Sequence, residues 1–217
     1  MKKSIFAVLL FLGMETCCHA EMVVRLSNIT DSGATLAWIS DGTGTCKVNY
    51  GTSADSMTIT GYDIRGSKTV SRIHFVAVTD LNPLTTYYYQ SILNNKQGMG
   101  GTITTNHSLV PSGSYLAYGQ VLEGYKPAVN CMVSLWLEDG DGKGNQGKST
   151  VASCLTDENG YWFYDLINLR TQDGKGLFGF SEQGDLLYLD VNAEDGTVVK
   201  TRMDTGACMP ARNLYLK

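Results

Sequence analysis

Acidic residues in one glycine-rich segment have the spacing with which a calcium-binding loop begins. In EDGDGKGNQGKS (138–149), Asp139 and Asp141 fill the first and third positions of a D-x-D-x-D pattern. Lys143 stands at the fifth position, where the pattern needs an oxygen ligand, and no Glu stands at the twelfth. The segment is therefore interpreted as a polar hairpin loop, and the sequence predicts no metal site.

No set of side chains combines a nucleophile, a base and an orienting group in a recognisable spacing. A hydrolase would have to use carboxylates such as Asp139, Asp157 and Asp190, and carboxylates in Gly/Asn-rich turns normally shape the turn. His74 lies in the middle of a predicted strand and is interpreted as a structural histidine. The sequence therefore predicts a protein that is not an enzyme and has no cofactor, with a cryptic hydrolase as the least favoured alternative.

Alternation in two predicted strands places aromatic residues on outward faces. In NCMVSLWLE (130–138) the aliphatic residues face the core and Trp136 faces outward; in YWFYDL (161–166) Trp162 faces the core. The predicted binding residues are Trp136, Tyr161 and Phe163, as an exposed aromatic patch on one sheet. Such a patch suits a partner protein, the neighbouring domain or a sugar ring.

The elements that position these residues are strands. Beyond residue 20, period-2 alternation recurs in short runs rich in Val, Ile, Thr and Tyr, such as ATLAWIS (34–40) and TYYYQSIL (86–93). Turn residues separate the runs every 8–12 positions, a spacing typical of sandwiches. We expect an all-β fold of two tandem antiparallel Greek-key β-sandwiches.

The domain boundary is predicted in NHSLVPSG (106–113), which has no periodicity and contains Pro111 and Gly113. The predicted division is a first sandwich over 21–106, a linker over 107–113 and a second sandwich over 114–217. Because the linker is short, we expect the two sandwiches to touch.

The N-terminus predicts export. Lys2 and Lys3 precede the apolar run IFAVLLFLGM (5–14), which is too short to anchor a protein in a bilayer, so no transmembrane segment is predicted. Small residues before Glu21 predict a signal peptide over 1–20, and the mature protein is expected to be secreted, periplasmic or on the cell surface. Lipid attachment at Cys17 or Cys18 is a less favoured alternative, because the preceding residues do not resemble a lipobox.

Four cysteines follow the predicted leader. An even number in an exported protein favours disulfides, and four cysteines permit three complete pairings. The Cys131–Cys208 bridge is preferred because both residues stand near the ends of predicted strands. Zinc is not indicated, since there is no C-x-x-C motif and only two histidines lie beyond residue 20. The candidates for disulfides are Cys46, Cys131, Cys154 and Cys208.

Residues 22–105 resemble a fibronectin type III domain. VVRLSNITDSGATLAWIS places Trp38 on the second strand, and CKVNYGTS (46–53) is similar to the third strand. The L-x-P-x-T-x-Y corner of that family is matched by Leu81, Pro83, Thr85 and Tyr87. The resemblance implies that the Tyr87 hydroxyl bonds to nearby backbone, because a buried phenol needs a partner.

Residues 115–217 resemble the carboxypeptidase regulatory-like domain, a transthyretin-type sandwich of about seven strands. The resemblance rests on YGQVLEG (118–124), AVNCMVSLWL (128–137) and LTDENGYWFYDL (155–166). It implies that the Thr156-Asp157 pair and Gly160 shape a hairpin between two strands and that an aromatic residue, here Trp162, follows.

Two scaffold modules without catalytic residues predict an exported, non-enzymatic binding or structural module of the cell surface, envelope or extracellular matrix. Its expected partner is a protein or a polysaccharide; the alternative is a carbohydrate-binding accessory protein for secreted enzymes. Nucleic acid is not expected, because the formal net charge is −4 and no block of Lys or Arg could follow a phosphate backbone.

Overall fold

The computed structural model describes residues 23–217, so the predicted signal peptide with Cys17 and Cys18 lies outside the described residues. Within that range the regular elements are strands and two single-turn 3-10 helices, Leu166–Asn168 (η1) and Thr205–Ala207 (η2). The predicted all-β sandwich fold is confirmed. No helix between residues 23 and 217 combines the length and hydrophobicity needed to cross a membrane.

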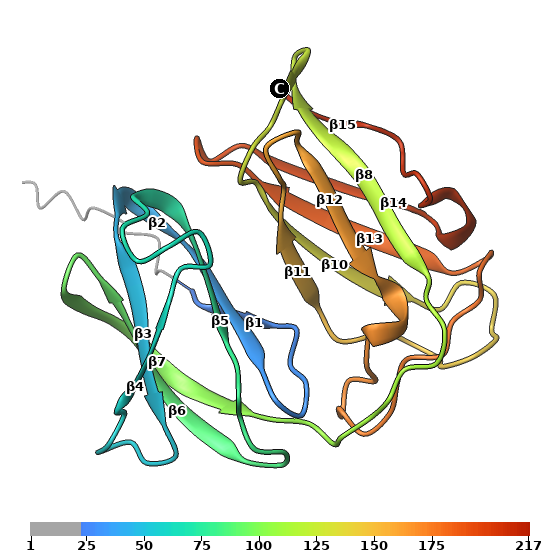
Figure 1. Cartoon of the computed structure of the whole chain (residues 1–217). Coiled ribbons are helices and arrows are strands. Elements are labelled where there is room, and N and C mark those ends of the chain that lie inside the picture. Colours follow the sequence, from blue (N-terminus) through green and yellow to red (C-terminus); the bar gives the residue numbers. More distant parts are fainter. Residues whose placement is uncertain (1–22) are drawn as a thin grey trace, which may run out of the picture.

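The first sandwich pairs a three-stranded sheet, β1-β2-β5, with a four-stranded sheet, β4-β3-β6-β7 (Figure 1). Every strand pair in both sheets is antiparallel. Apolar residues of both sheets, among them Leu36, Val48 and Val76, meet between them as one core. The strands are β1 (Arg25–Ser27), β2 (Ala34–Gly44), β3 (Cys46–Gly51), β4 (Ile59–Tyr62), β5 (Ser71–Val78), β6 (Thr86–Leu93) and β7 (Lys96–Thr104).

Two residues that carry the fibronectin type III resemblance lie where it places them. Trp38 on β2 is buried in the core between the sheets. Tyr87 on β6 is also buried, and its phenol oxygen accepts the backbone N–H of Asn82 at 2.9 Å. This hydrogen bond gives the buried phenol its partner and holds the corner that leads into β6.

Replacing Tyr87 by Phe is expected to lower the free energy of unfolding by about 1 kcal/mol, because the Asn82 N–H loses its acceptor while the ring stays buried. Tyr88→Phe is the matched control: its ring points away from the core, and a change within about 0.5 kcal/mol is expected. Urea unfolding followed by circular dichroism measures both variants. Equal losses would contradict the role given to the corner.

The second sandwich pairs the sheet β11-β10-β13-β14 with the sheet β12-β8-β15, and the short β9 also pairs with β8. One pair departs from the predicted antiparallel arrangement: β15 runs parallel to β8, with Leu214 opposite Val121. The chain crosses between the sheets after β14, and such a crossover lets the last strand join the first in the same direction. The strands are β8 (Leu116–Glu123), β9 (Lys126–Pro127), β10 (Met132–Glu138), β11 (Ala152–Leu155), β12 (Tyr161–Asp165), β13 (Leu186–Asn192), β14 (Val198–Asp204) and β15 (Leu214–Leu216).

The Thr156–Gly160 segment joins β11 to β12, which lie in opposite sheets, so it is a crossover and not the expected hairpin. The Thr156 hydroxyl donates to the carbonyl of Ala128 at 2.7 Å, and Asp157 Oδ1 accepts the N–H of Tyr161 at 2.8 Å. Gly160 has φ +74°, and a Cβ there would lie 2.5 Å from a carbonyl oxygen of β8. The turn residues are therefore fixed by local geometry.

The two sandwiches touch through one sheet of each. The β1-β2-β5 sheet faces the β11-β10-β13-β14 sheet (Figure 1), and side chains of both join in one buried apolar cluster. The first sandwich contributes Ala37, Ile73 and Phe75, and the second contributes Met132. Met132 points away from the core of its own sandwich, so the outward face of β10 is partly covered by the first sandwich.

Polar contacts hold the same interface. Glu194, in the turn between β13 and β14, accepts the Ser71 hydroxyl and the Arg72 N–H, the latter at 2.9 Å, while Arg72 Nη1 donates to the Glu194 carbonyl at 3.0 Å. The Asn28 side chain donates to the Ser153 carbonyl at 2.8 Å and accepts the Ser153 N–H at 3.0 Å. These two groups of hydrogen bonds join the two sandwiches at separate points of the interface.

Candidate functional site

The structure separates the three aromatic residues that were predicted to form one patch. Tyr161 and Phe163 lie on β12, whereas Trp136 lies on β10 in the other sheet of the second sandwich. All three point away from the core, but the outward faces of two packed sheets point in opposite directions. The single patch is therefore not formed, because alternation gives the face of a strand and not the sheet that contains it.

Trp136 is partly buried, and neighbouring side chains stack on its ring and accept its N–H. Its ring stacks on Tyr188 of β13, with centroids 5.2 Å apart and planes 8° from parallel. Its indole N–H donates to Glu138 at 3.1 Å, and Glu138 also pairs with Lys148. Arg202 donates to the Tyr188 hydroxyl at 3.3 Å. The polar and aromatic groups of Trp136 thus have partners within the second sandwich.

Tyr161 and Phe163, by contrast, belong to a larger exposed surface. They are 44% and 62% exposed, and Phe163 lies directly opposite Tyr118 of β8. On β15, Tyr215 is 53% exposed and pairs with Leu122. We call this surface the aromatic face; it consists of Leu116, Tyr118, Gln120, Leu122, Tyr161, Phe163 and Tyr215.

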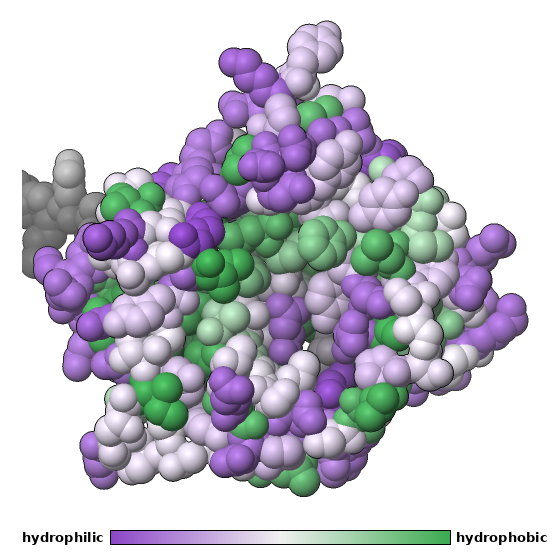
Figure 2. Space-filling view, viewed as in Figure 1, coloured by the Kyte–Doolittle hydropathy of each residue, from purple (hydrophilic) through white to green (hydrophobic). Residues whose placement is uncertain are grey.

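The middle of the molecule carries hydrophobic residues where β12 and β8 face the viewer (Figure 2). None of the seven residues of the aromatic face is charged. The hydroxyls of Tyr118, Tyr161 and Tyr215 have no hydrogen-bond partner among residues 23–217, and Gln120 donates its amide N–H to the Asn159 carbonyl at 3.0 Å. The aromatic face therefore combines apolar rings with free hydrogen-bonding groups.

Sequence reasoning missed the β8 and β15 members of the aromatic face. The signal was present in LAYGQVLE (116–123), where the inward residues Ala117, Gly119 and Val121 alternate with Leu116, Tyr118, Gln120 and Leu122. The position of β15 beside β8 could not be inferred, because parallel pairing of the first and last strands depends on the tertiary crossover.

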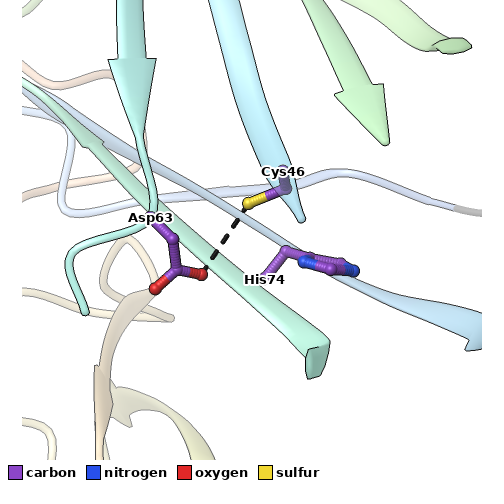
Figure 3. Close-up of side chains that lie close together, drawn as sticks. All are labelled: Cys46, Asp63 and His74. Carbon is purple, nitrogen blue, oxygen red and sulfur yellow. Dashed lines mark hydrogen bonds between the residues drawn. The ribbon is translucent and has the colours of Figure 1, made fainter. Parts of the chain in front are cut away.

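A second group of chemistry-bearing side chains lies at one end of the first sandwich. Cys46, Asp63 and His74 approach one another, with one ligand-type atom of each within 4.8 Å of the others (Figure 3). The Cys46 thiol donates to the Asp63 carboxylate at 3.7 Å. The same carboxylate accepts two guanidinium N–H groups of Arg65, each at 2.8 Å, and the backbone N–H of Phe75 at 3.1 Å.

Burial and internal pairing determine the charge states of this cluster. Burial raises the pKa of the Cys46 thiol to about 12 and lowers the pKa of His74 to about 4. Burial would raise the pKa of Asp63, but the hydrogen bonds from Arg65 outweigh it and hold that pKa below its ordinary value. At neutral pH the cluster holds a neutral thiol, a neutral imidazole and a carboxylate–guanidinium pair. A neutral thiol is not a nucleophile, and Arg65 already supplies the positive charge that a metal ion would bring.

His74 is the structural histidine expected from the sequence. Its Nε2 lies 2.9 Å from the Ser40 hydroxyl, and its ring lies against Trp38 with the centroids 5.0 Å apart. The Asp63–Arg65 pair beside it was not predicted, because nothing in YDIRGS (62–67) shows that these two charges are buried.

The predicted polar loop gains a third carboxylate from a distant part of the chain. Asp185, fully buried before β13, lies within 4.8 Å of Asp139 and Asp141. Asp185 accepts two backbone N–H groups, each at 2.8 Å, and Asp141 faces the Lys143 ammonium at 3.2 Å. These contacts shape the loop around Asp185, in agreement with its interpretation as a polar hairpin loop.

The expected Cys131–Cys208 bridge is not formed. Cys131 directly precedes Met132, at one end of the sheet that contains β10, β13 and β14. Cys208 comes after Asp204, which lies at the opposite end of that sheet. The Cys208 thiol donates instead to the Thr205 carbonyl at 2.9 Å. A disulfide needs Cα atoms within about 7 Å of each other. That two cysteines stand near strand ends does not determine the distance between them. Free thiols are found at Cys46, Cys131, Cys154 and Cys208.

Comparisons with known proteins add no family assignment. No protein-family model matches the chain, and no curated protein matches it. Among solved structures, the chicken CNTN1 FN1–FN3 domains are 14% identical over 84% of this chain and 64% of that chain, with a TM-score of 0.31. The central fibronectin-III array of RIM-binding protein is 16% identical over 88% of this chain and 65% of that chain, with a TM-score of 0.30. The chain spans less than two thirds of both structures, and overlays this loose carry no argument about function.

Proposed function

We propose that the chain is an exported, non-enzymatic binding protein that acts in the periplasm, on the cell surface or outside the cell. Its contact surface is the aromatic face of the second sandwich. The positively charged N-terminus with its apolar run supports export. The neutral states of Cys46 and His74 and the internal pairing of Asp63 support a role without catalysis.

The observation that carries the proposal is the exposure of Tyr161 and Phe163 beside Tyr118 and Tyr215. Other residues of β12 and β8, which alternate with these rings, point inward and form the core. The exposed rings therefore take no part in the packing of the core. The first sandwich packs on the opposite sheet and leaves the aromatic face free. Uncharged, aromatic-rich surfaces are characteristic of the centres of binding interfaces.

The second sandwich is assigned within this proposal to the carboxypeptidase regulatory-like type. Two features support the assignment: the fully buried Trp162, which is the aromatic residue expected after Gly160, and the seven strands of three or more residues. The contact through Glu194 and Met132 makes the first sandwich a fixed support for the second. A support of this kind would present the aromatic face at a constant orientation.

Retention on isolated envelope material from the source cells tests the proposal. The mature wild-type chain is expected to be retained, and the Tyr161→Ser/Phe163→Ser variant is expected to lose retention by about tenfold or more, since hot-spot aromatics each contribute over 1 kcal/mol. Ile59→Ser/Tyr62→Ser is the matched control, because these β4 residues are 47% and 50% exposed on the first sandwich. Equal retention of all three proteins, or no retention of the wild type, would overturn the proposal.

A further inference from the structure

We propose that the ligand of the aromatic face is a neutral polysaccharide chain. This inference rests on the proposed function of that face and names its chemical class. It is carried by the arrangement of the rings, by the absence of charge and by the hydrogen-bonding groups that have no partner inside the protein.

The aromatic face is an elongated strip along β8. On β8 its members run from Leu116 to Leu122, which at 3.3–3.4 Å per residue makes a strip about 20 Å long. Phe163 and Tyr118 form one cross-strand row, Tyr161 and Gln120 form the next, and Tyr215 lies beside the end of the strip at Leu122. An extended chain of sugar rings can lie along a strip of this length, and the apolar C–H faces of such rings pack on aromatic side chains.

Charge favours a neutral polymer over a charged one. The seven residues carry no charge, while the whole chain carries a formal net charge of −4. Asp165 closes one end of the strip, but it accepts the Ser114 hydroxyl at 2.7 Å and the Tyr115 N–H at 2.8 Å. An anionic polymer would meet an acidic protein and find no cation among the seven residues, and a cationic polymer would find no carboxylate among them.

Hydrogen bonding favours sugar over a second copy of the chain. The hydroxyls of Tyr118, Tyr161 and Tyr215 and the carbonyl oxygen of Gln120 have no partner among residues 23–217, and they stand among the rings. A second copy could satisfy these groups only where its own hydroxyls and amide came into register with them, and each group left unpaired would cost about 1–3 kcal/mol. The hydroxyls of a polysaccharide supply both donors and acceptors along the whole strip.

Native gel electrophoresis through gels that contain a soluble polysaccharide measures this binding. The panel consists of hydroxyethyl cellulose, mixed-linkage β-glucan, xylan and galactomannan as neutral chains, with carboxymethyl cellulose as the charged comparison. We expect at least one neutral polysaccharide to retard the wild-type chain. The Tyr161→Ser/Phe163→Ser variant is expected to show an apparent Kd raised by about tenfold or more, and Ile59→Ser/Tyr62→Ser is expected to behave as the wild type.

Two further variants separate stacking from hydrogen bonding and from misfolding. Tyr215→Phe keeps the ring and removes a free hydroxyl, so a smaller loss of retardation is expected than for the double variant. Gln120→Glu places a negative charge in the strip. It is expected to weaken binding of the neutral chains and to give no binding of carboxymethyl cellulose. Circular dichroism and thermal unfolding show whether each variant keeps the fold.

Three results would overturn the inference: no retardation by any neutral polysaccharide, equal retardation of the double variant, or retardation by carboxymethyl cellulose alone. Sedimentation velocity gives the competing outcome. A wild-type dimer that the double variant abolishes would assign the aromatic face to a second copy of the chain. In that case, or if envelope retention depends on the face while no neutral polysaccharide binds, the inference fails and the binding function of the face stands.

Discussion

Asp63→Asn is expected to lower the free energy of unfolding of the first sandwich by about 3–5 kcal/mol, a large fraction of what a domain of this size has. The substitution keeps the volume and removes only the charge. It leaves the Arg65 guanidinium, of which the side chain is 15% exposed, without its counter-charge. The Cys46 thiol and the Phe75 N–H share the same acceptor and are weakened with it. Urea unfolding monitored by fluorescence, with hydrogen exchange of β3 and β5, measures the loss.

Asp173→Asn is the matched control for charge removal. Asp173 also pairs with a cation, Lys175, but both side chains are more than half exposed, so a change within about 0.5 kcal/mol is expected. The double variant Asp63→Leu/Arg65→Met replaces both charges by apolar groups of similar size and is expected to recover much of the loss. If Asp63→Asn is as stable as Asp173→Asn, the buried pair does not hold β4 and β5 together.

The fold could be predicted where local chemistry determines it. Trp162 was placed in a core by alternation, and Trp38 and the Tyr87 corner by the resemblance to fibronectin type III domains; all three side chains are buried. The resemblance implied a backbone partner for the Tyr87 hydroxyl, and the Asn82 N–H provides it. Such features depend on residues close together in the chain, so the sequence contains all the information they require.

The rest depends on which segments meet across the fold. The sequence showed which residues of β10 and β12 point outward, but it did not show that these strands lie in different sheets. Trp136 was therefore grouped with Tyr161 and Phe163. The same limit applies to the missing Cys131–Cys208 bridge, whose two residues were judged by strand ends alone. The candidate site was thus half predicted: two of its rings were identified, and the strands that complete it were not.

The interface and the buried cluster of the first sandwich form one continuous network. Arg72, which holds Glu194 of the second sandwich, also donates from Nε to the Ser40 carbonyl at 3.0 Å. The Ser40 hydroxyl in turn lies 2.9 Å from His74 Nε2. Protonation of His74 would therefore alter the hydrogen bonds next to the residues that join the sandwiches, so the acid stability of the protein should report on this network.

The free energy of unfolding is expected to fall as the pH decreases from 6.5 to about 4. His74→Gln is expected to remove the part of that fall that comes from protonation of His74. Burial lowers the pKa of folded His74 to about 4 from an ordinary value of 6.5. Between these values the unfolded chain binds a proton that the folded protein does not, so lower pH favours unfolding. The effect is about 1.4 kcal/mol per pH unit, or about 3 kcal/mol over the whole window. The contribution of Asp63 is lost only at lower pH, because its folded pKa lies below its ordinary value of 3.8.

The difference between variant and wild type isolates His74 from the carboxylates that titrate beside it. Glutamine keeps a group that can bond to Ser40 but does not titrate, so urea unfolding at several pH values between 7 and 4.5 should give a flatter profile for His74→Gln. His107→Gln is the matched control, since it makes the same substitution at an exposed histidine. A His74→Gln profile parallel to that of the wild type would show that folded His74 takes up its proton at the same pH as the unfolded chain. The imidazole would then be charged beside Trp38 below pH 6.5, and Asp63 would have to balance two cations instead of one.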